Sequence, residues 1–182
     1  MNATLTRLSK FVSLVLRHQP ETYGLALDAH GWARVDDLLA AAARAQVPLT
    51  RELLIEVVAE NDKQRFVLSE DGSVIRARQG HSVQVDLQFV PLEPPEVLYH
   101  GTAARFLTSI RAQGLLPQAR QHVHLSADRE TATRVGARHG KPAILVVASG
   151  ALHQAGHAFY RSENGFWLTA AVPVAYIAFP EA

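Results

Sequence analysis

Apolar residues recur at helical spacing through the first part of the chain. The first stripe predicts an amphipathic helix over residues 3–17, which Pro20 ends within three residues. Its apolar members are Leu5, Leu8, Val12, Val15 and Leu16. Two further helices are expected, each after a polar N-cap: residues 37–44 after Asp36, and residues 51–60 after Thr50.

Short β-patterns accompany these helices. Residues 31–35 are strand-like, and residues 65–68 and 74–77 flank the turn Glu70-Asp71-Gly72, which is a hairpin signal. Three helices followed by a hairpin form a winged-helix pattern, which we expect for residues 1–90. The proline-rich segment 91–96 then predicts a linker, because proline cannot continue a helix or a central strand.

The remainder, residues 97–182, is rich in strands. The expected strands are 97–102, 122–126, 143–148, 159–161, 166–169 and 174–179. Two helices are expected among them, residues 103–113 ending at Gly114 and residues 129–138 capped by Asp128. The fold class predicted for the whole chain is therefore α+β with two lobes.

Composition limits the possible chemistry. The 48% apolar content is typical of a globular protein, and the absence of cysteine excludes disulfides, thiolate metal sites and thiol nucleophiles. No apolar run reaches the roughly 18 residues that a membrane span needs, and no signal-peptide pattern is present, so a cytoplasmic location is the default expectation. The net charge is only +1, so a polyanion would have to bind a local patch.

Basic residues that suit such a patch lie in the first lobe. Arg17 and His18 end the first helix, where cations also complement the helix dipole. Lys63, Arg65, Arg76 and His81 lie around the predicted hairpin. Arginine forks are suited to bidentate phosphate contacts, so we expect these groups to meet near one end of the lobe.

In the second lobe, polar groups gather at predicted strand ends. His100, Gly101 and Thr102 end one strand, and the glycine is expected to let a ligand approach the backbone. His124 and Ser126 end another, directly before a helix N-terminus that favours anions. The His122-x-His124 pair could ligate a metal, but no third ligand has matching spacing, and we expect no metal.

Taken in order, these motifs resemble the RNA 2′-phosphotransferase family over nearly the whole chain. In the first lobe the matching stretches are 16–20, 24–32, 61–66 and 75–82. In the second lobe they are 98–102, 122–126 and 159–169. The resemblance implies a winged-helix RNA-binding lobe followed by an ADP-ribosyltransferase-like lobe that binds NAD as a consumed co-substrate.

The resemblance also implies roles for individual residues. The family's catalytic groups map onto Arg17, His18, Arg65 and Arg138. NAD contacts are expected from His100, Gly101, Thr102, His124, Leu125, Ser126 and Asp128. Substrate phosphate or RNA contacts are expected from Lys63, Arg76 and His81. Nothing in the sequence points to an obligate protein partner or a membrane.

The implied reaction removes an internal RNA 2′-phosphate in two steps. The phosphate displaces nicotinamide from C1″ of NAD, and O2″ then attacks the phosphorus, giving 2′-OH RNA and ADP-ribose 1″,2″-cyclic phosphate. The strand Phe166–Thr169 carries no glutamate of the kind many ADP-ribosyltransferases use, and Glu163 lies in the preceding turn. Two alternatives stay open: an ADP-ribosyltransferase acting on terminal phosphates of nucleic acids, and a winged-helix regulator that senses NAD.

Overall fold

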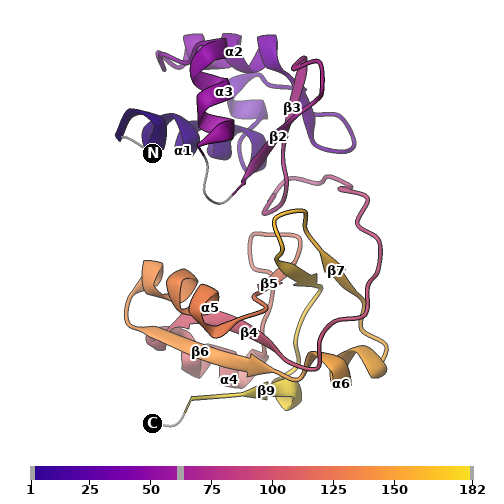
Figure 1. The fold of residues 1–182 in the computed structure, drawn as a ribbon. Coiled ribbons are helices and arrows are strands. Elements are labelled where there is room, and N and C mark those ends of the chain that lie inside the picture. Colours follow the sequence, from indigo (N-terminus) through magenta and orange to yellow (C-terminus); the bar gives the residue numbers. More distant parts are fainter. Residues whose placement is uncertain (1–2, 61–63, 181–182) are drawn as a thin grey trace. The chain divides into compact units, whose positions relative to one another are not determined.

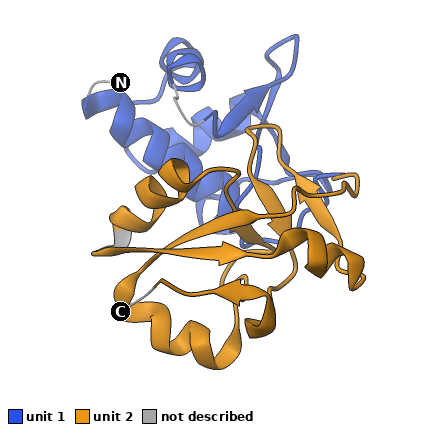
Figure 2. Ribbon diagram, turned by 60° about the horizontal axis from the view of Figure 1, so that its bottom comes forward, with its two compact units in different colours: residues 1–88 blue, residues 89–182 orange. Residues whose placement is uncertain are grey.

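The computed structural model describes residues 3–60 and 64–180 (Figure 1). The chain divides into two compact units, residues 1–88 and residues 89–182, which are coloured separately in Figure 2. Each unit has a hydrophobic core of its own. Within the described ranges, no helix is long and apolar enough to cross a membrane.

The helices of the first unit follow the predicted apolar stripes. They are α1 (Ala3–Arg17), the 3-10 helix η1 (Glu21–Tyr23), α2 (Val35–Arg44) and α3 (Arg51–Ala59). The Thr50 side chain accepts a hydrogen bond from the amide of Leu53 (3.3 Å), so the predicted cap of α3 is confirmed. The predicted Asp36 cap is wrong, because α2 begins at Val35, two residues earlier than predicted, with Arg34 at the N-cap position.

A small antiparallel sheet completes the first unit. Its strands are β1 (Trp32–Arg34), β2 (Phe66–Leu68) and β3 (Val74–Ala77), in the order β1-β3-β2. Side chains alternate across the sheet, and Ala33, Phe66 and Ile75 are buried in the core at 2% exposure or less. The opposite face of the sheet therefore carries the more exposed residues.

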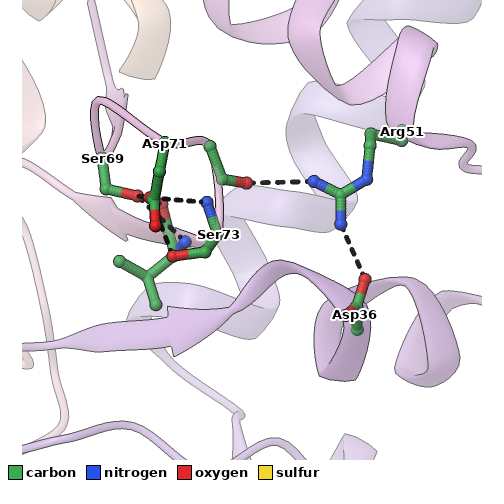
Figure 3. Close-up of polar contacts among 7 residues, drawn as sticks. Asp36, Arg51, Ser69, Asp71 and Ser73 are labelled. Carbon is green, nitrogen blue, oxygen red and sulfur yellow. Dashed lines mark hydrogen bonds and ion pairs between the residues drawn. The ribbon is translucent and has the colours of Figure 1, made fainter.

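The β2–β3 turn is held by the carboxylate of Asp71 (Figure 3). This carboxylate accepts hydrogen bonds from Ser69 Oγ (2.6 Å) and from the amide and hydroxyl of Ser73 (3.0 and 2.8 Å). These bonds lower the pKa of Asp71 to about 2. Nearby, Arg51 donates to Asp36 (2.7 Å) and to the carbonyl of Gly72 (3.0 Å), which ties the turn to α2 and α3.

The second unit is built on two small antiparallel sheets. One has the order β4-β6-β9, from β4 (Leu98–Ala103), β6 (Pro142–Val147) and β9 (Ile177–Ala178). The other has the order β5-β8-β7, from β5 (Val123–Leu125), β8 (Trp167–Thr169) and β7 (Phe159–Arg161). An isolated bridge between Tyr99 and Ser126 joins β4 to the end of β5.

Helices surround these sheets. They are α4 (Leu107–Gln113), α5 (Arg129–Gly136), α6 (Ser149–Gln154) and three 3-10 helices, η2 (Ala104–Phe106), η3 (Ala137–His139) and η4 (Val174–Tyr176). The Asp128 side chain accepts from the amide of Thr131 (2.7 Å), which confirms the predicted cap of α5. Sequence patterns missed α6, and the last predicted strand is wrong over residues 174–176, which form η4. The α+β class is confirmed.

The segment expected to be a linker is bonded to the second unit. Pro91 bridges Tyr160, and the amide of Leu92 donates to the carbonyl of Phe159 (2.8 Å). Further along, Ser149 Oγ donates to the carbonyl of Pro95 (2.6 Å). Residues 91–96 thus run along this unit as part of its structure.

Candidate active site

Arg17 and His18 lie at the end of α1, where the segment that follows β3 binds the backbone of the helix. Arg17 is the last residue of α1, and its carbonyl accepts hydrogen bonds from the amides of Ser82 (2.9 Å) and Val83 (3.4 Å). The last carbonyls of an α-helix have no amide partner within the helix, and these two bonds satisfy the carbonyl of Arg17. The chain after β3 therefore closes over the C-terminus of α1 and determines where both side chains emerge.

The Arg17 side chain is half-buried and lies toward the start of β2. Its Nη2 donates to the carbonyl of Arg65 (3.5 Å), and its guanidinium lies 6.0 Å from the centre of the Phe66 ring. A side chain on Gly80 would place its Cβ 3.6 Å from Arg17 Nη1, so Gly80 lies directly against the guanidinium. The structure thus places the Arg17 side chain, which adjoins His18 in the chain, against the backbone of Arg65 in the first unit.

His81 lies beneath this group rather than on the surface. Its side chain is 1% exposed, and neither ring nitrogen has a hydrogen-bond partner among the described residues. Burial is the main reason why the pKa of His81 is lowered to about 4, and the charges of Arg17, His18 and Arg76 contribute to the same shift. His81 is therefore neutral near pH 7. Lys63, the other residue expected beside Arg65, lies outside the described residues.

In the second unit, the Tyr99–Ser126 bridge aligns two of the predicted binding segments. The two residues exchange backbone hydrogen bonds of 2.9 and 2.7 Å. His100 Nδ1 donates to the carbonyl of His124 (3.0 Å), which leaves Nε2 of the neutral ring as an acceptor. Burial is the main reason why the pKa of His100 is lowered. His100, His124 and Ser126 are therefore brought together.

Arg120, which was not predicted as a site residue, also lies beside His124. Its Nη1 lies 3.4 Å from His124 Nδ1. Desolvation lowers the pKa of Arg120, and the charge of Arg138 in η3 lowers it as well. The charges of Arg120 and Arg138 therefore act on each other, and such like charges favour binding of an anion. Arg138 itself is exposed.

Gly101 allows the backbone of α5 to pack closely against β4, a role that the sequence did not predict. A Cβ at this position would lie 1.7 Å from the carbonyl oxygen of Ala132 and 2.9 Å from the amide of Gly136. The backbone that approaches Gly101 is that of α5, so the expected ligand approach at the Cβ position is wrong. Moreover, His100, Gly101 and Thr102 lie within β4, which continues to Ala103.

The remaining predicted contacts lie in β4 and around the β5–α5 junction. Thr102, Leu125 and Ser126 are buried, at 7%, 0% and 5% exposure, whereas Asp128 is exposed at the start of α5. Hydrogen bonding to Thr131 is the main reason why the pKa of Asp128 is lowered. Among the residues that the structure describes, no group of three or more His, Cys, Asp or Glu side chains could hold a metal ion.

Each unit brings together arginines and histidines, a combination that suits a protein that binds phosphate groups. A profile of the RNA 2′-phosphotransferase, Tpt1 / KptA family matches residues 3–171, and the chain belongs to this family. The resemblance inferred from the motifs is thereby confirmed. The family name denotes transferases that act on RNA 2′-phosphate.

Similar proteins cover the chain almost completely. A "Probable RNA 2′-phosphotransferase" of Acaryochloris marina is 55% identical over 176 residues, covering 97% of this chain and 97% of the relative. One of Hahella chejuensis is 57% identical over 178 residues, with 98% and 96% covered. One of Agrobacterium fabrum is 58% identical over 172 residues, with 94% and 92% covered.

Proposed function

We propose that this protein removes an internal 2′-phosphate from RNA and transfers it to NAD. The 2′-phosphate oxygen bonds to C1″ of the nicotinamide ribose as the bond to nicotinamide breaks. The O2″ hydroxyl then attacks the phosphorus, and the RNA leaves with a 2′-OH. ADP-ribose 1″,2″-cyclic phosphate is the other product. In this reading the first unit is a winged-helix RNA lobe and the second an ADP-ribosyltransferase-like lobe.

The main support for this proposal is the packing of residues 80–83 against the end of α1. It presents Arg17 and His18 together, with the Arg17 guanidinium bonded to the carbonyl of Arg65. A pre-positioned guanidinium neutralises a phosphate dianion without reorganising during the reaction. We assign Arg17 and Arg65 to the transferred phosphate. His18 is assigned to a hydrogen bond or proton transfer at the phosphate or O2″.

The second unit supplies groups that fit NAD. Arg120 and Arg138 repel each other, so an anionic pyrophosphate or phosphate bound beside them relieves that repulsion. His100 is assigned to the adenosine side, together with Thr102. His124, Leu125 and Ser126 are assigned to the nicotinamide riboside, and Asp128 orients the start of α5 through its bond to Thr131. Bound NAD supplies the electrophilic C1″ and the O2″ hydroxyl.

The residues also fit a reaction without a metal or a catalytic carboxylate. A phosphate acceptor is already an anion, so it needs no base to become nucleophilic. Glu163, the carboxylate nearest to the strand β8 in sequence, is exposed in the turn before it. We therefore give Glu163 no catalytic role.

The test is one incubation of the purified protein with a short RNA carrying an internal 2′-phosphate, with and without NAD. The proposal predicts loss of phosphate from the RNA and release of nicotinamide only when NAD is present. Phosphate loss that is equally fast without NAD would contradict the role of NAD. Stable ADP-ribosylated RNA would select the terminal-phosphate transferase, and reversible binding of intact NAD would select the regulator.

A further inference from the structure

The outer face of the sheet in the first unit carries a defined set of side chains. Because Ala33, Phe66 and Ile75 face the core, the residues that alternate with them face away from it. The strand register places Trp32 opposite Arg76, and Arg76 opposite Val67. Residues directly opposite each other in an antiparallel pair lie on the same face, so these three form one row across the sheet.

Arginines extend this row in both directions. Arg34 pairs with Val74 on one side, and on the other side the amide of Arg78 donates to the carbonyl of Arg65 (2.9 Å). We call this set the outer face: Trp32, Arg34, Arg65, Val67, Val74, Arg76 and Arg78. No member of the set is acidic, which concentrates positive charge locally although the whole chain has a net charge of only +1.

A cation–aromatic pair lies in the middle of the outer face. The guanidinium of Arg76 lies 4.8 Å from the centre of the Trp32 ring system. Both side chains are partly buried and partly accessible, and Arg34 beside them is exposed. Many proteins that bind single-stranded nucleic acid combine an aromatic ring with nearby arginines. The ring stacks on a base, and the guanidiniums contact phosphates.

The outer face is continuous with the groups assigned to the 2′-phosphate. Arg65 belongs to both, because its carbonyl accepts from Arg17 Nη2 (3.5 Å) while its backbone pairs with Arg78. A chain bound along the outer face would therefore lead toward Arg17 and His18. The sequence alone did not predict an aromatic platform, since Trp32 and Arg76 are far apart in the chain.

We propose that the outer face binds the nucleotides that flank the 2′-phosphate in single-stranded RNA, with Trp32 stacking on one base and Arg34, Arg76 and Arg78 contacting the backbone. The partner is single-stranded because a stacked base must be unpaired. The inference rests on the proposed function for the identity of the phosphate. It can be tested by binding alone, without turnover.

The direct test uses tryptophan fluorescence. The chain has two tryptophans, and Trp167 is buried in the second unit at 7% exposure. In a Trp167→Phe variant, Trp32 is the only reporter. Titration with an unmodified RNA oligonucleotide should quench its emission saturably, because a base stacks on the ring. Unchanged emission at RNA concentrations that saturate binding would overturn the stacking role of Trp32.

Variants then separate stacking from charge, with binding measured by anisotropy of a labelled RNA. Trp32→Leu should weaken binding about 5- to 150-fold, and Trp32→Phe should recover most of the loss. Arg34→Gln, at an exposed position, should reduce the slope of log K against log salt by about 0.7, as expected for one lost contact to a single strand. Arg7→Gln, an exposed arginine on α1, is the matched control and should leave the slope unchanged.

A turnover measurement distinguishes this inference from the proposed function. In Arg34→Gln, KM should rise more for a long RNA than for a dinucleotide carrying the same 2′-phosphate. Equal KM changes for both RNAs would overturn the inference while leaving the proposed function intact. Binding that responds to Trp32 and Arg34, in a protein that does not remove the phosphate, would support the outer face and contradict the proposed function.

Discussion

His18 Nδ1 lies 2.9 Å from Ser82 Oγ, and the same hydroxyl lies 3.4 Å from the carbonyl of Arg17. A serine hydroxyl has one hydrogen, so its direction and the protonation of Nδ1 are coupled. When the hydroxyl donates to the Arg17 carbonyl, His18 must donate from Nδ1, and Nε2 of the neutral ring becomes an acceptor. Ser82 thereby links the orientation of the catalytic candidate to the backbone of α1.

Replacing Ser82 should therefore remove a hydrogen bond that orients the His18 ring. We expect Ser82→Ala to lower kcat by about 10-fold or more and to shift the pH profile of kcat/KM, because the ring loses its orienting partner. Ser82→Thr keeps the hydroxyl and should restore both. The measurement is a pH–rate profile of the three proteins. A simple loss of activity with an unshifted profile, not recovered by threonine, would assign Ser82 a purely structural role.

The two arginines of the second unit should differ in their importance. Arg120 lies against His124, whereas Arg138 is exposed and its charge lowers the pKa of Arg120. We expect Arg120→Ala to lower kcat/KM by about 100-fold or more, and Arg138→Ala to have a smaller effect. Arg134→Ala, an exposed arginine on α5, serves as a control. Full activity of Arg120→Ala would remove this residue from the site.

Burial of a neutral His81 should make the first unit acid-sensitive. Its pKa of about 4 in the folded protein is below the value of about 6.5 in an unfolded chain, so the unfolded state binds the additional proton between these pH values. The free energy of unfolding should therefore decrease, by about 2–3 kcal/mol, as pH falls from about 6.5 to about 4. Urea unfolding followed by Trp32 fluorescence in Trp167→Phe measures this.

The matched variant for that experiment is His81→Leu in the same background. It is expected to flatten the pH dependence across this window, because the titrating group is gone. An unchanged slope between pH 6.5 and pH 4 would show that His81 is not the group responsible. The carboxylate of Asp71 titrates in a different window, because its contribution is lost only as pH falls from about 3.8 through about 2.

Gly101 should be irreplaceable for packing. A methyl group there would lie 1.7 Å from the carbonyl oxygen of Ala132, so α5 would have to move away from β4. We expect Gly101→Ala to destabilise the second unit by about 3 kcal/mol or more, measured by urea unfolding with Trp167 as reporter. Gly156→Ala is the comparison: its φ of +95° disfavours alanine, but nothing lies within 4 Å of the new methyl, so about 1–2 kcal/mol is expected. Equal losses would contradict the packing role.

Local signals made much of the fold predictable from the sequence. The helix α1 follows from its apolar stripe, and α3 and α5 begin at Thr50 and Asp128, whose side chains cap the adjacent turn. The Asp36 cap failed because α2 starts at Val35, whose amide donates to the carbonyl of Ser73, while Asp36 binds Arg51. These competing bonds come from segments distant in sequence.

The sequence could indicate individual residues of the candidate site, but not the contacts between distant segments that position them. Arg17 and His18 could be found as a pair, but the hydroxyl of Ser82 reaches them only after the hairpin has folded. Arg120 lies in an irregular segment before β5 without periodicity, and its approach to His124 depends on that turn. Likewise, Trp32 meets Arg76 because β3 lies between β1 and β2, an order that the sequence does not reveal.

The central claim is that the phosphate moves intact from RNA to ADP-ribose. The most direct measurement is one incubation of the full chain with NAD and an RNA whose internal 2′-phosphate alone is radiolabelled, followed by separation of the products. We predict that the label leaves the RNA and appears in ADP-ribose 1″,2″-cyclic phosphate, with one nicotinamide released for each phosphate transferred. Label released as inorganic phosphate, or retained on the RNA while NAD stays intact, would contradict the account.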